Sequence, residues 1–185
     1  DGRKPYLIPY GGSNPVGAMG YVHAMLELTH QDIHPDWIVF PSSSGGTQAG
    51  MMVGSRLSGY TGKILGISVD EPAEKLQTHV ANLANETATF MGETWTFKVS
   101  DVLVNDDYTG GGYAVIGEPE IEAIRLFAKR EALLLDPVYT GRAASGMIDL
   151  IRKGFFELTE TVLFWHTGGT PALFASTYQG RLTEK

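Results

Sequence analysis

The sequence contains no cysteine among its 185 residues, which excludes disulfide bonds, thiolate nucleophiles and cysteine-ligated zinc sites within it. Positive charge is scarce as well: 14 lysines and arginines stand against 21 aspartates and glutamates, a net charge of −7. Because the basic residues form no cluster, we expect no binding of nucleic acid and no attraction to a membrane surface. The apolar runs are far shorter than the ~20 residues of a membrane span, and none is typical of a targeting segment, so we expect a cytoplasmic protein.

Glycine is the residue type in excess. The chain has 23 glycines among 185 residues, about one in eight, whereas an average protein has about 7%. The glycines follow no collagen period, and many lie in clusters after apolar stretches. The length favours a single domain. An apolar fraction of 43% and a charged fraction of 19% indicate a globular chain.

Short apolar runs rich in β-formers alternate with longer amphipathic segments, which predicts an α/β fold, a three-layer sandwich with a mainly parallel sheet. We expect strands at 6–8, 37–40, 64–69 and 162–165, with one short strand within 92–117. We expect helices at 15–28, 47–58, 119–129 and 143–153, with a further long helix opening at Pro72. Ligands bind at the carboxyl ends of parallel strands, so the loops that follow strands are the candidate sites.

The strongest motif, SSSGGTQAG at 42–50, stands between a predicted strand and a predicted helix. Its small residues Ser44, Gly45, Gly46 and Thr47 let backbone N–H groups approach an anion, and the helix start adds partial positive charge. No lysine follows the glycines, which excludes the P-loop of nucleoside triphosphatases, and the spacing does not fit a dinucleotide fingerprint. We expect a single phosphate monoester here; a tight turn with a serine cap is the alternative.

Residues 11–14 (GGSN) also precede a helix, either as a second anion contact or, more commonly, as a tight connection. After the last predicted strand, Thr167 can offer a neutral hydrogen bond to a ligand, although the glycines beside it also suit close packing. His166 is either a general base or, more often in such places, a structural residue. The histidines do not gather with carboxylates at metal-ligand spacing, so we expect no metal site.

Tyr113 and Tyr139 each lie beside chain-breaking residues. A tyrosine hydroxyl can bind a substrate carboxylate, or move a proton where its surroundings lower its pKa. Tyrosines in loops are otherwise packing residues, and the residues alone leave both alternatives open.

Five motifs together carry a resemblance to a known family. They are residues 11–15 (GGSNP), 44–50 (SGGTQAG), 110–113 (GGGY), 135–141 (LDPVYTG) and 166–169 (HTGG). In this order they resemble D-cysteine desulfhydrase and its relative aminocyclopropane-carboxylate deaminase, over nearly the whole chain. Those enzymes use pyridoxal 5'-phosphate and have the tryptophan-synthase-β type of fold.

The resemblance implies a role for each matching residue. It places the cofactor phosphate on Ser44, Gly45, Gly46 and Thr47. It makes Tyr113 and Tyr139 catalytic residues that face the substrate and the cofactor ring. It places Thr140 toward the pyridine nitrogen, where the deaminases carry glutamate, and Thr167 and Gly168 near the same ring edge.

Thr140 favours the desulfhydrase branch, because a neutral hydroxyl strengthens the electron sink less than a carboxylate does. We therefore expect β-elimination on a small amino acid, converting D-cysteine to pyruvate, sulfide and ammonia. Deamination of aminocyclopropane-carboxylate is one alternative. A non-catalytic domain that binds a phosphorylated ligand is the other.

The resemblance also implies a Schiff-base lysine upstream of the segment that matches Pro5. The seven lysines, at 4, 63, 75, 98, 129, 153 and 185, all lie outside that context. We therefore expect 1–185 to be the C-terminal part of the large cofactor-binding domain, with the family's N-terminal segment and small domain absent and the segment alone inactive. The expected assembly is a homodimer, joined where needed by an N-terminal chain segment that carries the lysine.

Overall fold

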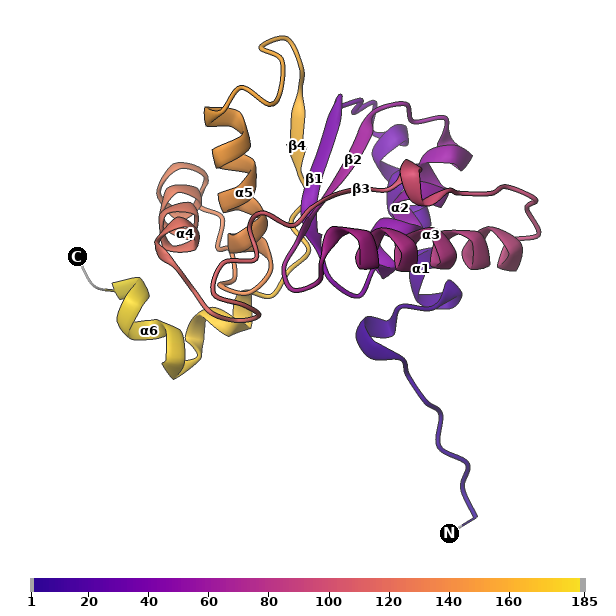
Figure 1. Ribbon diagram of the computed structural model, residues 1–185, viewed down its shortest axis with the longest axis horizontal. Coiled ribbons are helices and arrows are strands. Elements are labelled where there is room, and N and C mark those ends of the chain that lie inside the picture. Colours follow the sequence, from indigo (N-terminus) through magenta and orange to yellow (C-terminus); the bar gives the residue numbers. More distant parts are fainter. Residues whose placement is uncertain (1, 184–185) are drawn as a thin grey trace.

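The computed structural model describes residues 2–183 and has a four-stranded parallel sheet at its centre (Figure 1). The strands are β1 (Trp37–Ser42), β2 (Lys63–Ser68), β3 (Leu103–Asn105) and β4 (Val162–Phe164), and their order across the sheet is β3-β2-β1-β4. All six residues of β1 are buried, as expected for a parallel strand covered on both faces. The predicted α/β fold is confirmed.

Helices cover both faces of the sheet and complete three layers (Figure 1). One face carries α1 (Pro15–His30), α2 (Gly46–Ser58) and α3 (Ala73–Phe90), which share an apolar core. The other face carries α5 (Thr140–Arg152), with α4 (Glu118–Glu131) and then α6 (Ser176–Thr183) packed outside it. Within residues 2–183, no helix combines the length and the hydropathy needed to cross a bilayer.

The register of the sheet brings three strand ends to one edge. Ser42 pairs with Ser68, so β1 and β2 finish level with each other. On the other side of β1, Val39 pairs with Phe164, where β4 ends. The loops that follow these strands therefore meet at the carboxyl edge of the sheet, where open parallel sheets bind ligands.

The strand predicted at 6–8 is wrong. Residues 2–9 form no strand and extend away from the sheet and helices, as Figure 1 shows. Tyr6, Leu7 and Ile8 are 80, 88 and 71% exposed. Their β-rich composition is insufficient because a strand also needs a hydrogen-bonded neighbour, and none of the described strands pairs with them.

Candidate active site

A cavity of about 290 Å³ lies at the carboxyl edge of the sheet. The loop after β1 and the loop after β4 form most of its wall, with Tyr139 from the segment before α5. Six residues predicted from the sequence line it together: Ser44, Gly45, Thr47, Tyr139, Thr167 and Gly168. Gly46 belongs to the same loop, whereas Tyr113 and Thr140 are not among the lining residues.

The 44–47 loop is built to expose backbone N–H groups. Gly45 has a left-handed backbone (φ 80°) and, as a glycine, has no side chain of its own to cap the start of α2. The N–H groups of a helix's first turn point out of its start, which here is the side where Gly45 and Thr47 line the cavity. Partial positive charge and free donors at such an end suit a phosphate group.

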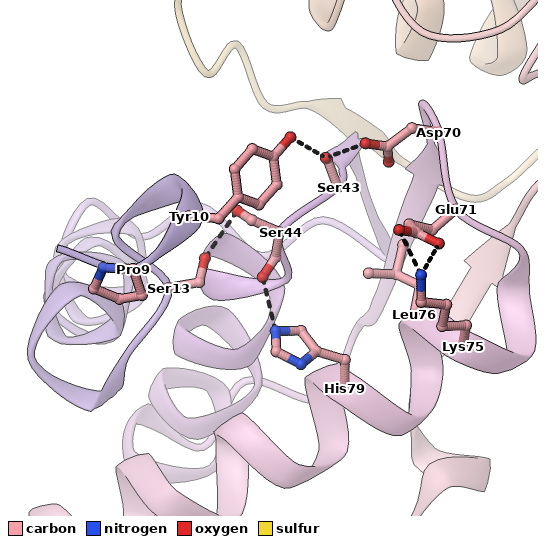
Figure 2. A pocket seen from close by; sticks show the side chains of 10 residues that line it. All are labelled: Pro9, Tyr10, Ser13, Ser43, Ser44, Asp70, Glu71, Lys75, Leu76 and His79. Atoms are coloured by element: carbon pink, nitrogen blue, oxygen red, sulfur yellow. Dashed lines mark hydrogen bonds and ion pairs between the residues drawn. The ribbon is translucent and has the colours of Figure 1, made fainter. Parts of the chain in front are cut away.

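Two side chains outside the motif hold this loop in shape (Figure 2). Ser13 accepts a hydrogen bond from the Gly46 N–H at 3.1 Å and donates one to the Ser44 Oγ at 2.8 Å. His79 of α3 reaches the Ser44 carbonyl through Nε2 at 3.1 Å. A Cβ on Gly46 would lie 2.6 Å from the Ser13 Oγ, so any other residue there would displace Ser13. These constraints fit a preformed phosphate cradle.

Neither of these supports can be read from the motifs. The sequence leaves two interpretations of residues 11–14, an anion contact or a tight connection. In the structure, Ser13 instead forms hydrogen bonds to the 44–47 loop. The side chain of Asn14 caps α1 by accepting from the Gly17 N–H at 2.8 Å. His79 gives no local signal, because its partner lies 35 residues away along the chain.

Ser43, the residue before the 44–47 loop, lies between this cavity and a second one. Ser43 donates to the Asp70 Oδ2 at 2.8 Å, and Figure 2 shows Tyr10 on its other side. Ser43 and Ser44 line both the cavity described above and a neighbouring one of about 270 Å³. The loop is therefore the wall between two hollows.

Asp136 organises the start of α5. Its side chain is fully buried and accepts from the N–H groups of Val138, Tyr139 and Thr140, at 2.8, 2.8 and 2.7 Å. In the sequence, Asp136 stands within the motif at 135–141 without a role of its own. An aspartate just before a helix is also a typical capping residue, which is the signal that could have identified it.

Thr140 is committed to Asp136. Its hydroxyl donates to the Asp136 Oδ1 at 2.7 Å and accepts from the Asp136 N–H at 2.8 Å, and its side chain is fully buried. The single hydroxyl proton of Thr140 is therefore donated to Asp136, within the 136–140 turn. The sequence-based interpretation needs that hydroxyl to face a ring nitrogen, and the structure turns it toward Asp136 instead.

Tyr113 and Tyr139 come together through their hydroxyl groups, which share a short hydrogen bond. Their rings meet edge to face, with centroids 5.9 Å apart. Tyr113 is 48% exposed and comes from the 106–117 loop that follows β3, whereas Tyr139 lines the cavity. Burial, and then the hydrogen bond with Tyr113, raises the pKa of Tyr139. This is the reverse of the lowered pKa that a basic tyrosine needs, so Tyr139 suits a neutral hydrogen-bonding role.

We expect Tyr139 to stay neutral at pH 10, because burial raises its pKa above the ordinary value of 10.0. A tyrosine of this kind stabilises the folded protein below its unfolded pKa, and the contribution is lost as the pH rises through the folded value. Titration of tyrosinate ultraviolet absorbance should therefore give the same curve for Tyr139→Phe and the parent between about pH 8 and pH 10. A smaller rise in the variant over this range would show that Tyr139 ionises there.

In the loop after β4, Thr167 and Gly168 line the cavity, whereas the His166 side chain forms hydrogen bonds within the protein. The His166 Nδ1 accepts from the Gly168 N–H at 3.0 Å, so the proton lies on Nε2, 3.2 Å from the Leu134 carbonyl. With both ring nitrogens bonded, His166 has the structural role rather than that of a general base. Within residues 2–183, no three histidines, aspartates or glutamates are grouped as a metal site would require.

Comparison with known proteins identifies the family. The sequence matches the family described as "Pyridoxal-phosphate dependent enzyme" over residues 1–168. A solved structure of an ACC deaminase homologue superposes with a TM-score of 0.86 at 39% identity, covering 98% of this chain and 54% of that chain. An L-serine ammonia-lyase from Rhizomucor miehei superposes with a TM-score of 0.55 at 16% identity, covering 82% of this chain and 51% of that chain, and shares the fold.

The chain thus spans about half the length of these two solved structures. Its parallel sheet, its 44–47 loop and the matched range agree with the tryptophan-synthase-β-like fold expected from the motifs. The chain belongs to the family of pyridoxal-phosphate-dependent enzymes.

Proposed function

We propose that 1–185 is the C-terminal part of the large cofactor-binding domain of a lyase or deaminase that acts on a small amino acid. The observation that carries this proposal is one cavity in which the 44–47 loop faces Tyr139, Thr167 and Gly168. A phosphate donor set and neutral hydroxyls at the carboxyl edge of a sheet suit a phosphorylated, planar cofactor. When bound, pyridoxal phosphate supplies an electron sink that weakens bonds at the substrate α carbon.

The residues of this chain then have distinct tasks. The backbone of Ser44, Gly45 and Thr47 would hold the phosphate. Gly46, whose N–H bonds Ser13, would keep the loop in shape. Thr167 and Gly168 meet the ring edge from the loop after β4. The hydroxyl of Tyr139, neutral because of burial and kept in place by Tyr113, binds the substrate or gives it a proton.

Covalent attachment of the cofactor is assigned to a lysine outside this chain. Among the described residues no lysine lines the cavity. Lys75, in the neighbouring hollow, is paired with Glu71 at 2.7 Å. The catalytic unit is therefore the intact protein rather than the 185 residues alone.

The favoured reaction is elimination of sulfide from D-cysteine, in which the substrate and one water give pyruvate, hydrogen sulfide and ammonia. It is supported by Thr167, a neutral side chain that lines the cavity, where a carboxylate would favour a protonated ring nitrogen. Deamination of aminocyclopropane-carboxylate, in which water and the substrate give 2-oxobutanoate and ammonia, is the second candidate. The specific observation in its favour is the 39% identity to an ACC deaminase homologue.

Purified intact protein decides between the two. We expect release of sulfide and pyruvate from D-cysteine, dependent on added pyridoxal phosphate, with L-cysteine as the stereochemical control. Production of 2-oxobutanoate from aminocyclopropane-carboxylate without sulfide release would select the second candidate. No visible cofactor absorbance and no product from either substrate would overturn the proposal as a whole.

A further inference from the structure

Arg142 is the largest fully buried side chain of the described residues, and neither the motifs nor the proposed mechanism uses it. It stands on α5, three residues after Tyr139. Its Nε donates to the Glu120 Oε1 of α4 at 3.0 Å. Burying a guanidinium costs several kcal/mol, and a buried ion pair is by itself weak evidence of a gain in stability. The burial therefore calls for another reason.

The other N–H groups of Arg142 donate to backbone carbonyls in and beside the 106–117 loop. Nη1 donates to the carbonyls of Val69, the residue after β2, and of Gly112, both at 2.9 Å. Nη2 donates to the Val115 carbonyl at 2.6 Å. Gly112 and Val115 stand on either side of Tyr113, so one side chain holds the loop before and after this tyrosine.

Other contacts also reach this loop; from α6, the Arg181 Nη1 donates to the Ile116 carbonyl at 2.7 Å. Gly110 and Gly112 have positive φ angles of 56° and 109°, and the loop bonds to itself from the Gly112 and Val115 N–H groups. From α6, the Tyr178 hydroxyl donates to the Ala114 carbonyl at 2.9 Å. A loop rich in glycine gains most from such tethers, because it has the most conformational freedom to lose.

We propose that Arg142 is a positioning residue that keeps the Tyr113 hydroxyl against Tyr139. Both tyrosines are tied to it: Tyr139 precedes it by one helical turn, and Tyr113 lies between two carbonyls that it holds. The guanidinium is suited to this because its planar fork serves several acceptors at fixed angles, which a lysine ammonium does not. The inference rests on the proposed function in assigning the tyrosine pair to the substrate.

The chain offers a matched control in Arg152, at the other end of α5. Arg152 also pairs with a glutamate of α4, Glu122, but its side chain is 57% exposed. Its guanidinium donates to both carboxylate oxygens of that glutamate rather than to the loop. Arg152→Met removes an Arg–Glu pair between the same two helices without touching the 106–117 loop.

The test uses the intact protein and compares Arg142→Met, Arg142→Lys and Arg152→Met by amide hydrogen exchange. We expect exchange at Gly112 and Val115 to accelerate at least about tenfold in Arg142→Met, less in Arg142→Lys, and not in Arg152→Met. Because Arg142→Met leaves Glu120 buried and unpaired, the double variant R142M/E120Q is measured as well. It removes both charges and retains an acceptor for the Gly117 N–H, which Glu120 binds at 2.9 Å. Unchanged exchange at both amides in a folded variant would overturn the proposal.

A double-mutant cycle with Tyr113→Phe gives the second readout. If Arg142 acts through Tyr113, Arg142→Met should lower kcat/KM in the parent and change it little once Tyr113→Phe is present. Losses that multiply in full would show that Arg142 does not act through this tyrosine. If the parent protein has no lyase or deaminase activity, the proposed function fails, and hydrogen exchange still decides the role of Arg142 in holding the loop.

Discussion

Replacing Gly46 by valine should weaken binding of pyridoxal phosphate to the intact protein about 10- to 100-fold. The first added carbon would lie 2.6 Å from the Ser13 Oγ and 3.3 Å from its Cα and Cβ. Ser13 must then move, which breaks its bonds to the Gly46 N–H and the Ser44 Oγ. Two lost hydrogen bonds are worth roughly 1–3 kcal/mol, which corresponds to that range of affinity. Titration of the visible cofactor absorbance measures the effect.

Gly20 provides the control for this experiment. It lies inside α1, and a Cβ there would meet nothing within 4 Å. Gly20→Ala should leave cofactor affinity unchanged and favour the helix by up to about 1 kcal/mol. Equal affinity in Gly46→Val and the parent would remove the 44–47 loop from the phosphate site.

The sequence predicts the sheet and its helices well, because buried parallel strands and amphipathic helices carry their own apolar patterns. The segment 37–40 falls within β1 and 47–58 within α2, each within two residues of the observed bounds. The failure at 6–8 has the opposite cause. Tyr6, Leu7 and Ile8 have strand-like side chains, but pairing is a property of two segments, and one segment does not reveal it.

The site residues show the same difference between local patterns, which the sequence contains, and contacts between distant segments. Motifs after strands are enough to bring Ser44 and Thr167 to one cavity, because parallel strands end at one edge. Contacts between distant segments were beyond the motifs. The bond from Ser13 to Ser44 spans 31 residues, and the bond from Arg142 to the Val69 carbonyl spans 73. Such contacts depend on how the layers pack, which no local pattern records.

The second large effect is expected at Gly169, where the loop after β4 touches the start of α5. Gly169→Ala should lower the free energy of unfolding of this domain by about 2 to 5 kcal/mol. A Cβ there would lie 2.6 Å from the Asp136 Cγ and 2.7 Å from its Oδ1. Asp136 has no room to retreat, because it accepts from three backbone N–H groups and from the Thr140 hydroxyl. Overpacking costs about 1–3 kcal/mol, and a left-handed backbone (φ 88°) adds about 1–2 for alanine.

Gly168 separates these two contributions. Its φ is also positive, at 103°, but a Cβ on it would meet nothing within 4 Å. Gly168→Ala should therefore cost only the backbone preference, about 1–2 kcal/mol, in urea unfolding of the intact protein. If the two variants lose equal stability, Asp136 does not constrain the loop after β4. A larger loss at Gly169 would mean that one buried carboxylate sets both the start of α5, next to Tyr139, and the path of the chain that carries Thr167.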